Sequence, residues 1–368
     1  MMFSQCGPQR FISTNDAYDY LPTYFEEGGI KKVLFLHGEK SWAAAKPYMP
    51  EMPASVAIID VPFNGECSYE EIARVKEIAT QNQVDMVIGL GGGKCLDTVK
   101  SVTQGTNFKL GLIPTLASNC APWSALSVHY HENGEHINHE IYHETADIML
   151  LNPQVIVNSP INYFVAGIGD TLAKYYESEM IFENMQPEQF NTQLTISRAM
   201  AQACRDDLLE NSEQAIADMK KGEVTPVFRK VVETVIVTSG LVGGWGDYFA
   251  RATGAHSVHD ALTVFPATSD SLHGERVAYG ILVLLALEKR EDEMAELLPL
   301  YRSMGLPVCL ADLNLDGSDQ DVVAQIAHDT SADGTQIHFL PIDTGEQAVA
   351  RAITRVEEIT AGRNGCLK

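Results

Sequence analysis

The sequence predicts an α/β domain with a parallel sheet, followed by an all-helical domain. Short apolar runs alternate with helical patterns in the first part of the chain, two prolines interrupt the chain near residue 158, and long amphipathic patterns fill the remainder. We therefore expect domains at residues 1–158 and 159–368, since 368 residues exceed the usual size of a single core. A cleft between two such domains is a common ligand site.

Four apolar runs in the first domain are predicted strands. They cover residues 32–36, 55–59, 86–88 and 110–113. Between the second and third runs, Ser68 and Glu71 form a capping box that predicts a helix through about Gln81. Strands that alternate with helices build βαβ units, and such units form a parallel sheet.

Residues 127–142 alternate around Asn133-Gly134, which predicts a β-hairpin with a two-residue turn. In that register His131 lies opposite His136, close enough to share a cation. Hairpin tips are exposed and no carboxylate from a rigid helix joins this pair, so we interpret the cluster as a solvated surface with adventitious metal affinity. The histidines of the hairpin are His129, His131, His136 and His139.

The segment between Pro153 and Pro160 is predicted to be extended and to form the domain boundary, because the residue before a proline avoids the helical region. Beyond it, amphipathic patterns predict helices near residues 192–209, 227–252 and 275–288.

The formal net charge is −23, with 26 Lys and Arg against 49 Asp and Glu, which argues against nucleic-acid or anionic-membrane partners. The seven cysteines are scattered without a Cys-x-x-Cys pair, so reduced thiols are expected. No apolar run approaches the ~18 residues of a membrane span, and the N-terminus lacks a secretion signal pattern. We therefore expect a cytoplasmic protein that binds a small molecule.

The stretch GLGGGKCLDT, residues 89–98, directly follows a predicted strand. Consecutive glycines permit positive φ and let backbone N–H groups approach an anion, and a helix that begins near Lys94 would direct its N-terminal dipole at a pyrophosphate. Cys95 follows Lys94, so this is not a P-loop, and the glycines are too closely bunched for G-x-G-x-x-G. A tight strand-to-helix turn without a ligand is the alternative.

GGGKCLDTVK, residues 91–100, resembles the GGGK-x-LDT-x-K dinucleotide loop of the iron-dependent alcohol dehydrogenase superfamily, in particular its glycerol dehydrogenase group. IPTLASNCAPWSALS, residues 113–127, looks like that group's IPT-x-AS-x-DAP-x-SALS segment. The resemblance implies a Rossmann-like N-terminal domain, a helical metal-binding domain in a dehydroquinate synthase-like architecture, a homo-oligomer, and NAD or NADP as cofactor. The cofactor-binding residues that it implies are Gly92, Gly93, Lys94, Asp97, Thr115, Ser118, Ser124, Leu126 and Tyr130.

Three segments of the helical domain carry residues suited to a metal. By themselves, an aspartate here could begin a helix and each lone histidine is more often structural. The segments GIGDTLA, AHSVH and HGERVAYG resemble the superfamily's GIGD-x-LA, AH-x-x-H and HGE-x-VA-x-G blocks. The resemblance implies that Asp170, His256 and His273 hold one divalent cation, Zn²⁺ or Fe²⁺.

Two imidazoles and one carboxylate leave open coordination positions, as a catalytic metal requires. The cation would lower the pKa of a bound substrate hydroxyl, so that hydride can pass to the nicotinamide. His259 lies three residues after His256 and is the candidate for carrying the proton outward; a packing histidine is the alternative.

The resemblance places Gly38 where members of the superfamily often have an aspartate that binds the adenosine ribose. Loss of that carboxylate removes its repulsion of a 2′-phosphate, and Lys40 lies nearby, which favours NADP. Glu39 could restore selectivity for NAD, so both cofactors stay open.

Two departures concern the substrate. The group's DAP is Cys120-Ala121-Pro122 here and Trp123 follows, so glycerol is not the expected substrate, and the segment is closer to the hydroxycarboxylate dehydrogenase branch. Lys174, four residues after Asp170, is the candidate for attracting a carboxylate, with a surface lysine as the alternative and Arg251 as a second candidate.

The sequence thus predicts a metal-dependent NAD(P)(H) oxidoreductase that interconverts small 2-oxo acids and 2-hydroxy acids. Its predicted catalytic residues are His259 and Lys174, and its predicted substrate residues are Cys120, Trp123 and Lys174. A glycerol or polyol dehydrogenase of altered specificity is the alternative. A lyase like dehydroquinate synthase is disfavoured, because few basic residues surround Asp170 and His256.

Overall fold

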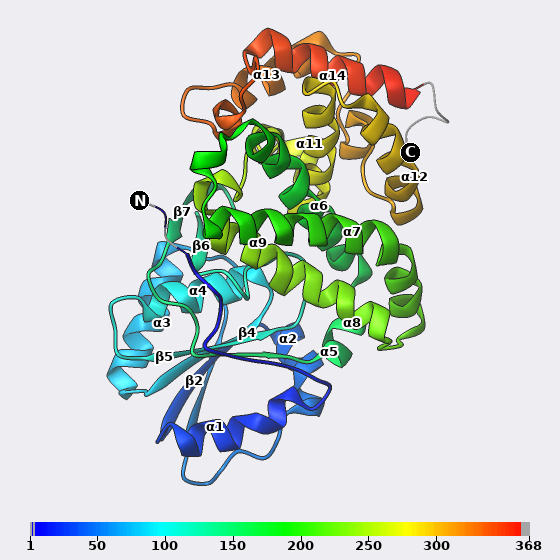
Figure 1. Cartoon of the computed structure of the whole chain (residues 1–368). Coiled ribbons are helices and arrows are strands. Elements are labelled where there is room, and N and C mark those ends of the chain that lie inside the picture. Colours follow the sequence, from blue (N-terminus) through cyan, green and yellow to red (C-terminus); the bar gives the residue numbers. More distant parts are fainter. Residues whose placement is uncertain (1, 3, 362–368) are drawn as a thin grey trace.

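The structure is a computed structural model that describes residue 2 and residues 4–361. Figure 1 shows the sheet at one end of the molecule, in blue and cyan, and a larger helical part in green to red. The predicted fold class is confirmed, with a parallel sheet in the N-terminal part and a largely helical C-terminal part. No described helix is long and apolar enough to cross a membrane.

The sheet has six parallel strands in the order β1-β8-β5-β4-β2-β3. The strands are β1 (Arg10–Ser13), β2 (Lys32–His37), β3 (Ala57–Pro62), β4 (Met86–Gly91), β5 (Lys109–Pro114) and β8 (Ile148–Leu151). The sequence predicted β2, β3, β4 and β5 and missed β1 and β8. His37 pairs with Leu90 and Leu90 pairs with Ile113, so three carboxyl ends meet at one edge of the sheet, where open parallel sheets bind their ligands.

Four helices precede β5. They are α1 (Leu21–Glu27), α2 (Glu39–Ala45), α3 (Tyr69–Asn82) and α4 (Gly93–Thr103). The predicted helix after Ser68 is confirmed, since the Ser68 side chain accepts the backbone N–H of Glu71 at 3.1 Å. The carboxylate of Glu71 turns instead to Arg74 and Asn64, so only half of the capping box forms.

The predicted hairpin is present, as β6 (Leu126–Tyr130) and β7 (His136–Ile141), but the two-residue turn was wrong. The backbone N–H of His131 donates to Glu135 O at 2.8 Å, and Gly134 adopts a φ of 86°, so the loop has three residues. A bulge shifts the register after His129, and His136 therefore lies opposite Tyr130 rather than opposite His131. The histidine pair on which the rival metal site depended does not form.

The segment after β8 is helical rather than extended. Asn152 accepts the N–H of Gln154 and Pro153 occupies the first turn of α5 (Pro153–Val157), a position where a missing N–H costs nothing. The further helices are α6 (Ile161–Asn184), α7 (Thr192–Lys221), α8 (Pro226–Glu233), α9 (Ser239–Gly246), α10 (Gly254–Leu262), α11 (His273–Leu287), α12 (Glu291–Met304), α13 (Gln320–Thr330) and α14 (Glu346–Ala361).

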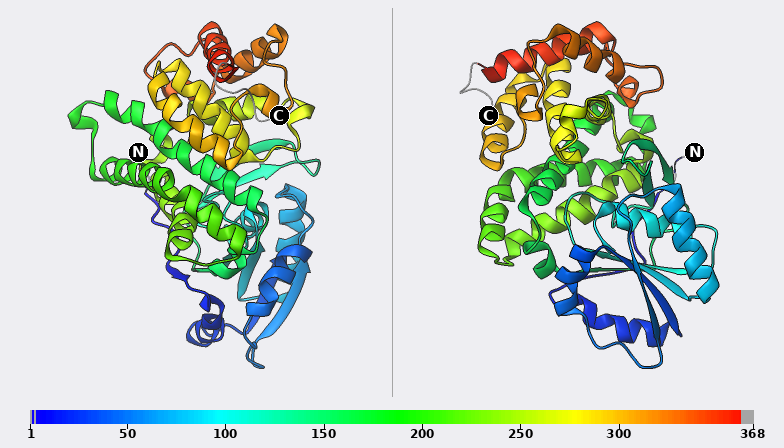
Figure 2. Two further views of the ribbon diagram at one scale, coloured as in Figure 1. Left: turned by 90° about the vertical axis from the view of Figure 1, so that its right-hand side faces the viewer. Right: turned by 180° about the vertical axis from the view of Figure 1, so that it is seen from behind.

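One apolar core runs through both parts of the chain. Leu34 and Val99 of the sheet region belong to the same buried cluster as Phe164 and Leu282 of the helical region. The hairpin lies between these parts in both views of Figure 2. The division after residue 158 stays a prediction, and the shared core means that the two parts bury apolar surface against each other.

The cysteines differ from the expectation in one respect. The free cysteines among the described residues are Cys6, Cys67, Cys95, Cys120 and Cys204. Cys309 is disulfide-bonded, contrary to the expectation of reduced thiols, and Cys366 lies outside the described residues.

Candidate functional site

Three helices bring the predicted metal ligands together. Asp170 comes from α6, His256 from the first turn of α10, and His273 is the first residue of α11; one ligand atom of each lies within 4.8 Å of the others. The Nε2 atoms of both histidines lie 3.4 Å from Asp170 Oδ1, which is buried and has no hydrogen-bond partner. A buried carboxylate oxygen without a donor, facing two imidazole nitrogens, fits a divalent cation. The cluster is the one group of this kind within residues 4–361.

Glu177 orients His256, and the sequence analysis missed it. Its carboxylate accepts His256 Nδ1–H at 2.7 Å and the backbone N–H groups of Thr253 and His256 at 2.7 and 2.9 Å. A proton on Nδ1 leaves the lone pair on Nε2 free to point toward Asp170, as a ligand requires. Glu177 lies seven residues after Asp170, two turns along the same face of α6, and this spacing was the available signal.

His259 contacts the second histidine ligand. Its Nε2 lies 2.9 Å from His273 Nδ1, and its Nδ1 lies 2.9 Å from Asp260 Oδ1. The side chain of Asp260 is 65% exposed, so a hydrogen-bonded chain runs from the ligand to solvent. Burial and the neighbouring His273 lower the pKa of His259 to about 3, and the ring is therefore neutral near pH 7.

Lys174 and Cys120 both lie beside the ligands. Burial alone would raise the pKa of Asp170, but Lys174 and the two histidines hold it well below its usual range. The Lys174 side chain is buried and its Nζ donates to the backbone oxygen of Arg251 at 3.2 Å. Cys120 interacts electrostatically with Lys174 and Asp170, and burial raises its pKa, so it is a neutral thiol. The surface-lysine alternative for Lys174 is therefore wrong.

Trp123 packs against α9 and the N-terminal part of the chain. Its ring packs edge-on against Phe11 at 5.3 Å, and a Cβ on Gly240 of α9 would come within 2.6 Å of its Cδ1 atom. The indole thus joins the loop after β5 to α9 and to the N-terminal segment. Its role in substrate binding stays a prediction.

The glycine loop begins α4, as predicted. Gly92 is the N-cap residue with a φ of −83°, and no side chain caps the helix, so its first N–H groups have no side-chain acceptor and are suited to an anion. None of the loop's three glycines uses the positive φ that glycine permits. A Cβ on Gly92 would lie 3.0 Å from Leu116 and one on Gly93 would lie 3.2 Å from Asn119, so these glycines provide space for a close approach. This cradle fits a dinucleotide phosphate.

Two other residues of this loop have partners within the protein. Lys94 Nζ lies 2.6 Å from Glu66 and 4.9 Å from the centre of the Tyr130 ring. The carboxylate of Asp97 is buried, pairs with Lys100 at 2.7 Å and accepts the N–H of Val128 at 3.1 Å. Asp97 therefore ties α4 to the hairpin, and its contact with a cofactor stays a prediction.

The other predicted cofactor residues lie at the end of β2 and in the segment that runs from the end of β5 into β6. Thr115 is buried, and its N–H donates to Gly91 O at 3.0 Å. Lys100 donates to the backbone oxygens of Ser124 and Leu126, which shapes the loop in which Ser118 also lies. Gly38 caps α2 at the end of β2, one strand away from Gly91, with Glu39 and Lys40 exposed beside it.

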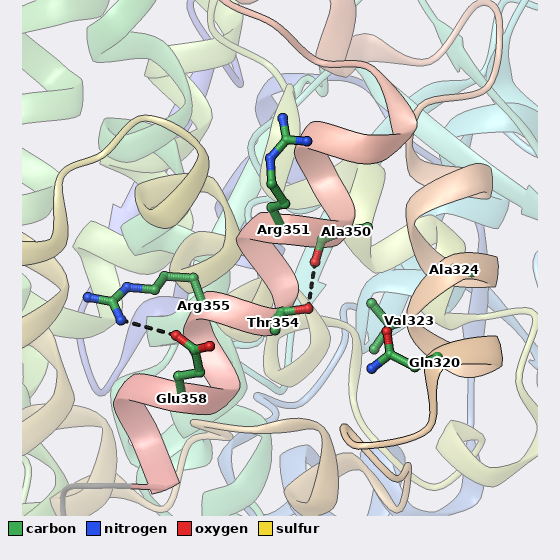
Figure 3. A pocket seen from close by; sticks show the side chains of 8 residues that line it. All are labelled: Gln320, Val323, Ala324, Ala350, Arg351, Thr354, Arg355 and Glu358. Carbon is green, nitrogen blue, oxygen red and sulfur yellow. Dashed lines mark hydrogen bonds and ion pairs between the residues drawn. The ribbon is translucent and has the colours of Figure 1, made fainter.

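A cavity of about 370 Å³ lies elsewhere, between α13 and α14 (Figure 3). It is lined by Gln320, Val323, Ala324, Ala350, Arg351, Thr354, Arg355 and Glu358. None of the predicted site residues borders it, so it plays no part in the candidate site.

Comparison with known proteins agrees with this geometry. Residues 8–153 match the family described as iron-containing alcohol dehydrogenase. Hydroxycarboxylate dehydrogenase A of Escherichia coli K12 is 35% identical over 357 residues, which are 96% of this chain and 97% of that protein. Glycerol dehydrogenase of Citrobacter freundii is 33% identical over 79% of each chain. The crystal structure of a probable glycerol dehydrogenase from Sinorhizobium meliloti 1021 superposes with a TM-score of 0.87 and 29% identity, over 99% of this chain and 100% of that one. The chain belongs to the iron-containing alcohol dehydrogenase family.

Proposed function

We propose that this protein is a metal-dependent NAD(P)(H) oxidoreductase that interconverts small 2-oxo acids and 2-hydroxy acids. The observation that carries the proposal is the cluster of Asp170, His256 and His273 with the buried amino group of Lys174 beside it. A positive charge next to a metal site suits a substrate that bears both a carbonyl and a carboxylate. The 35% identical hydroxycarboxylate dehydrogenase supports the same substrate class.

Asp170, His256 and His273 would hold the cation, Zn²⁺ or Fe²⁺, which when bound polarises a substrate oxygen. Glu177 keeps Nε2 of His256 unprotonated, and His259 does the same for Nε2 of His273 by accepting the proton on Nδ1. These hydrogen bonds orient both rings before any cation binds.

His259 reaches the site through His273, so its role here is to position a ligand rather than to touch substrate. Carrying the proton of the hydroxyl outward to Asp260 would require His259 Nε2 to leave His273 and accept that proton directly. Cys120 offers a small neutral thiol in place of a carboxylate, which avoids repelling an anionic substrate.

The carboxyl edge of the sheet would hold a nicotinamide cofactor, with the start of α4 binding its pyrophosphate, and the cofactor when bound would supply or accept the hydride. The open N-cap at Gly92 supports this site. Lys94 would exchange Glu66 for a phosphate, since the ion pair with Glu66 is partly exposed. NADP is favoured over NAD by the absence of a carboxylate at Gly38.

A polyol or glycerol dehydrogenase of altered specificity is the second candidate, supported by the glycerol dehydrogenases among the similar chains. Initial rates with the zinc-loaded protein separate the two. NADPH and NADH are each offered with 2-oxobutanoate, 2-oxoglutarate and dihydroxyacetone, and oxidation of the reduced cofactor is followed by absorbance. Turnover of the acids, lost on chelation, is expected; turnover of dihydroxyacetone alone would refute the hydroxyacid proposal.

A cytoplasmic location and a homo-oligomeric state belong to the same proposal. Cell fractionation tests the first and light scattering of the purified protein tests the second. A monomer at micromolar concentration would contradict the expected oligomer.

A further inference from the structure

Arg251 carries a positive charge near the metal ligands, and its ion pair with Asp247 is long and engages only the Nε atom. The side chain is only 15% exposed. Its Nε donates to Asp247 Oδ1 across 3.5 Å, at the long limit for a hydrogen bond, and its Nη1 and Nη2 make no hydrogen bond to a residue that the structure describes. A guanidinium that is largely buried and whose two Nη groups bond no described residue has donors left for an anionic ligand.

The neighbours of Arg251 place it beside the metal ligands. Lys174, which lies on the same helix face as Asp170, donates its Nζ to the Arg251 backbone oxygen at 3.2 Å. The guanidinium interacts electrostatically with Cys120, and His139 of the hairpin interacts with Arg251 in turn. Arg251 therefore lies where the hairpin, the loop after β5 and the start of α10 converge.

The packing around Arg251 leaves space for this orientation. Gly243 of α9 has no side chain, and a Cβ there would come within 3.3 Å of Arg251 Cγ and 3.7 Å of Nη1. The aliphatic part of the Arg251 side chain thus lies along α9, which limits the positions that its guanidinium can reach. A guanidinium held in this way loses little conformational freedom when a ligand binds.

We propose that Arg251 binds the carboxylate of the 2-oxo acid through its two Nη groups, and that Lys174 positions the Arg251 backbone. This inference rests on the proposed function, and it assigns the direct contact to Arg251 rather than to Lys174. The planar guanidinium matches both oxygens of a carboxylate, whereas the lysine ammonium is a point charge already directed at a carbonyl oxygen.

The test compares Arg251→Gln and Arg251→Lys with wild type in the zinc-loaded protein. One substrate is 2-oxobutanoate and the other is the neutral 1-hydroxy-2-butanone. Arg251→Gln is expected to lower the ratio of kcat/KM for the acid to that for the neutral ketone about 10- to 100-fold, mainly through KM, because charge-assisted hydrogen bonds are lost. Arg251→Lys keeps the positive charge but lacks the planar pair of donors, so it should lower this ratio by less than Arg251→Gln does.

A binding measurement accompanies the kinetics. Calorimetric titration of oxamate, a carboxylate with an uncharged amide, into the zinc-loaded protein with NADP⁺ should give a Kd raised by the same factor in Arg251→Gln. Arg351→Ala is the matched control, because Arg351 is exposed on α14 in the remote cavity (Figure 3); it should leave both the ratio and the Kd unchanged.

Two results would overturn the inference while the proposed function stands: equal losses for the acid and the neutral ketone in Arg251→Gln, or an unchanged Kd for oxamate. A purely structural role would also be revealed by Asp247→Asn, which removes the partner of Arg251 and would then copy the Arg251→Gln losses with both substrates. If the wild type itself reduces no 2-oxo acid and binds no oxamate, the proposed function fails and the inference fails with it.

Discussion

Replacing Glu177 by Gln should weaken metal binding about 10- to 100-fold although Glu177 does not touch the cation site itself. One carboxylate oxygen, Oε2, accepts His256 Nδ1–H at 2.7 Å. The other, Oε1, accepts two backbone N–H groups, from Thr253 at 2.7 Å and from His256 at 2.9 Å. A glutamine of the same shape has only one acceptor oxygen. It can therefore accept either from the His256 ring or from the two backbone N–H groups, and its NH₂ group then faces the other donors.

Both amide orientations are costly. If the NH₂ group faces His256, it favours the tautomer with the proton on Nε2, which is the atom that must bind the cation. If the NH₂ group faces the backbone, two buried donors at the start of α10 lose their acceptor, at about 1–3 kcal/mol. A penalty of about 1.4–2.7 kcal/mol corresponds to the expected 10- to 100-fold loss of affinity.

The assay is competition for Zn²⁺ between the protein and a chromophoric chelator. Glu179→Gln is the control, because Glu179 lies two residues further along α6, is equally buried, and pairs with Arg198 at 2.5 Å. It should lower stability without changing metal affinity. A Glu177→Gln protein that stays folded and binds Zn²⁺ within about threefold of wild type would refute the orientation argument.

Three further predictions follow from the packing and the charges. Gly274→Ala should abolish tight metal binding and lower the unfolding temperature, because its Cβ would lie 1.8 Å from Ala166 O; a normal zinc titration would contradict this. Zinc at about 100 times its Kd should stabilise the metal-free protein by about 2.7 kcal/mol in thermal unfolding, and Asp170→Asn should lose this gain. Burial raises the pKa of Glu288 from 4.5 to about 7, so its contribution to stability is present below pH 4.5 and is lost as pH rises through 7. The free energy of unfolding of Glu288→Gln, taken relative to that of wild type, should therefore rise by up to about 3 kcal/mol from pH 4 to pH 8, as measured by denaturant unfolding. If the difference between variant and wild type is the same at both pH values, the raised pKa of Glu288 is contradicted.

Local patterns were enough to predict β2, β3, β4 and β5 but not β1 and β8. The four predicted strands contain apolar runs that can be recognised in a short window of sequence. β1 (Arg10–Ser13) and β8 (Ile148–Leu151) have four residues each, and each residue of β1 pairs with a residue of β8 that lies 138 positions further along the chain. A short segment whose order depends on a distant partner carries little local signal.

The register of the β6-β7 hairpin also could not be predicted from the local pattern. Asn133-Gly134 correctly predicted a reversal, yet the register depends on whether Gly134 ends a three-residue loop or completes a two-residue turn. Both loops are compatible with the alternating pattern, and the bulge after His129 decides between them. The positions of the flanking histidines therefore could not be read from the spacing.

For the metal site, the ligands were predicted through the resemblance and not from spacing, since Asp170 and His256 are 86 positions apart. What the fold adds is the set of supporting contacts. Glu177 was within reach of the sequence, because Asp170, Lys174 and Glu177 share one face of a helix. That this face of α6 packs against the start of α10 is known only from the three-dimensional structure.

The glycines of the metal segments explain how these ligands come within reach of one another. A Cβ on Gly169 would lie 2.7 Å from the backbone oxygen of Gly274, and one on Gly274 would lie 1.8 Å from that of Ala166. Helices α6 and α11 therefore touch backbone to backbone one residue away from Asp170 and His273. A larger residue at either glycine would separate the helices and move the two ligands beyond the 4.8 Å that they now span. The glycines next to these ligands are thus a packing requirement of the site, and a chain that kept all three ligands but lost the glycines would be expected to lose the metal.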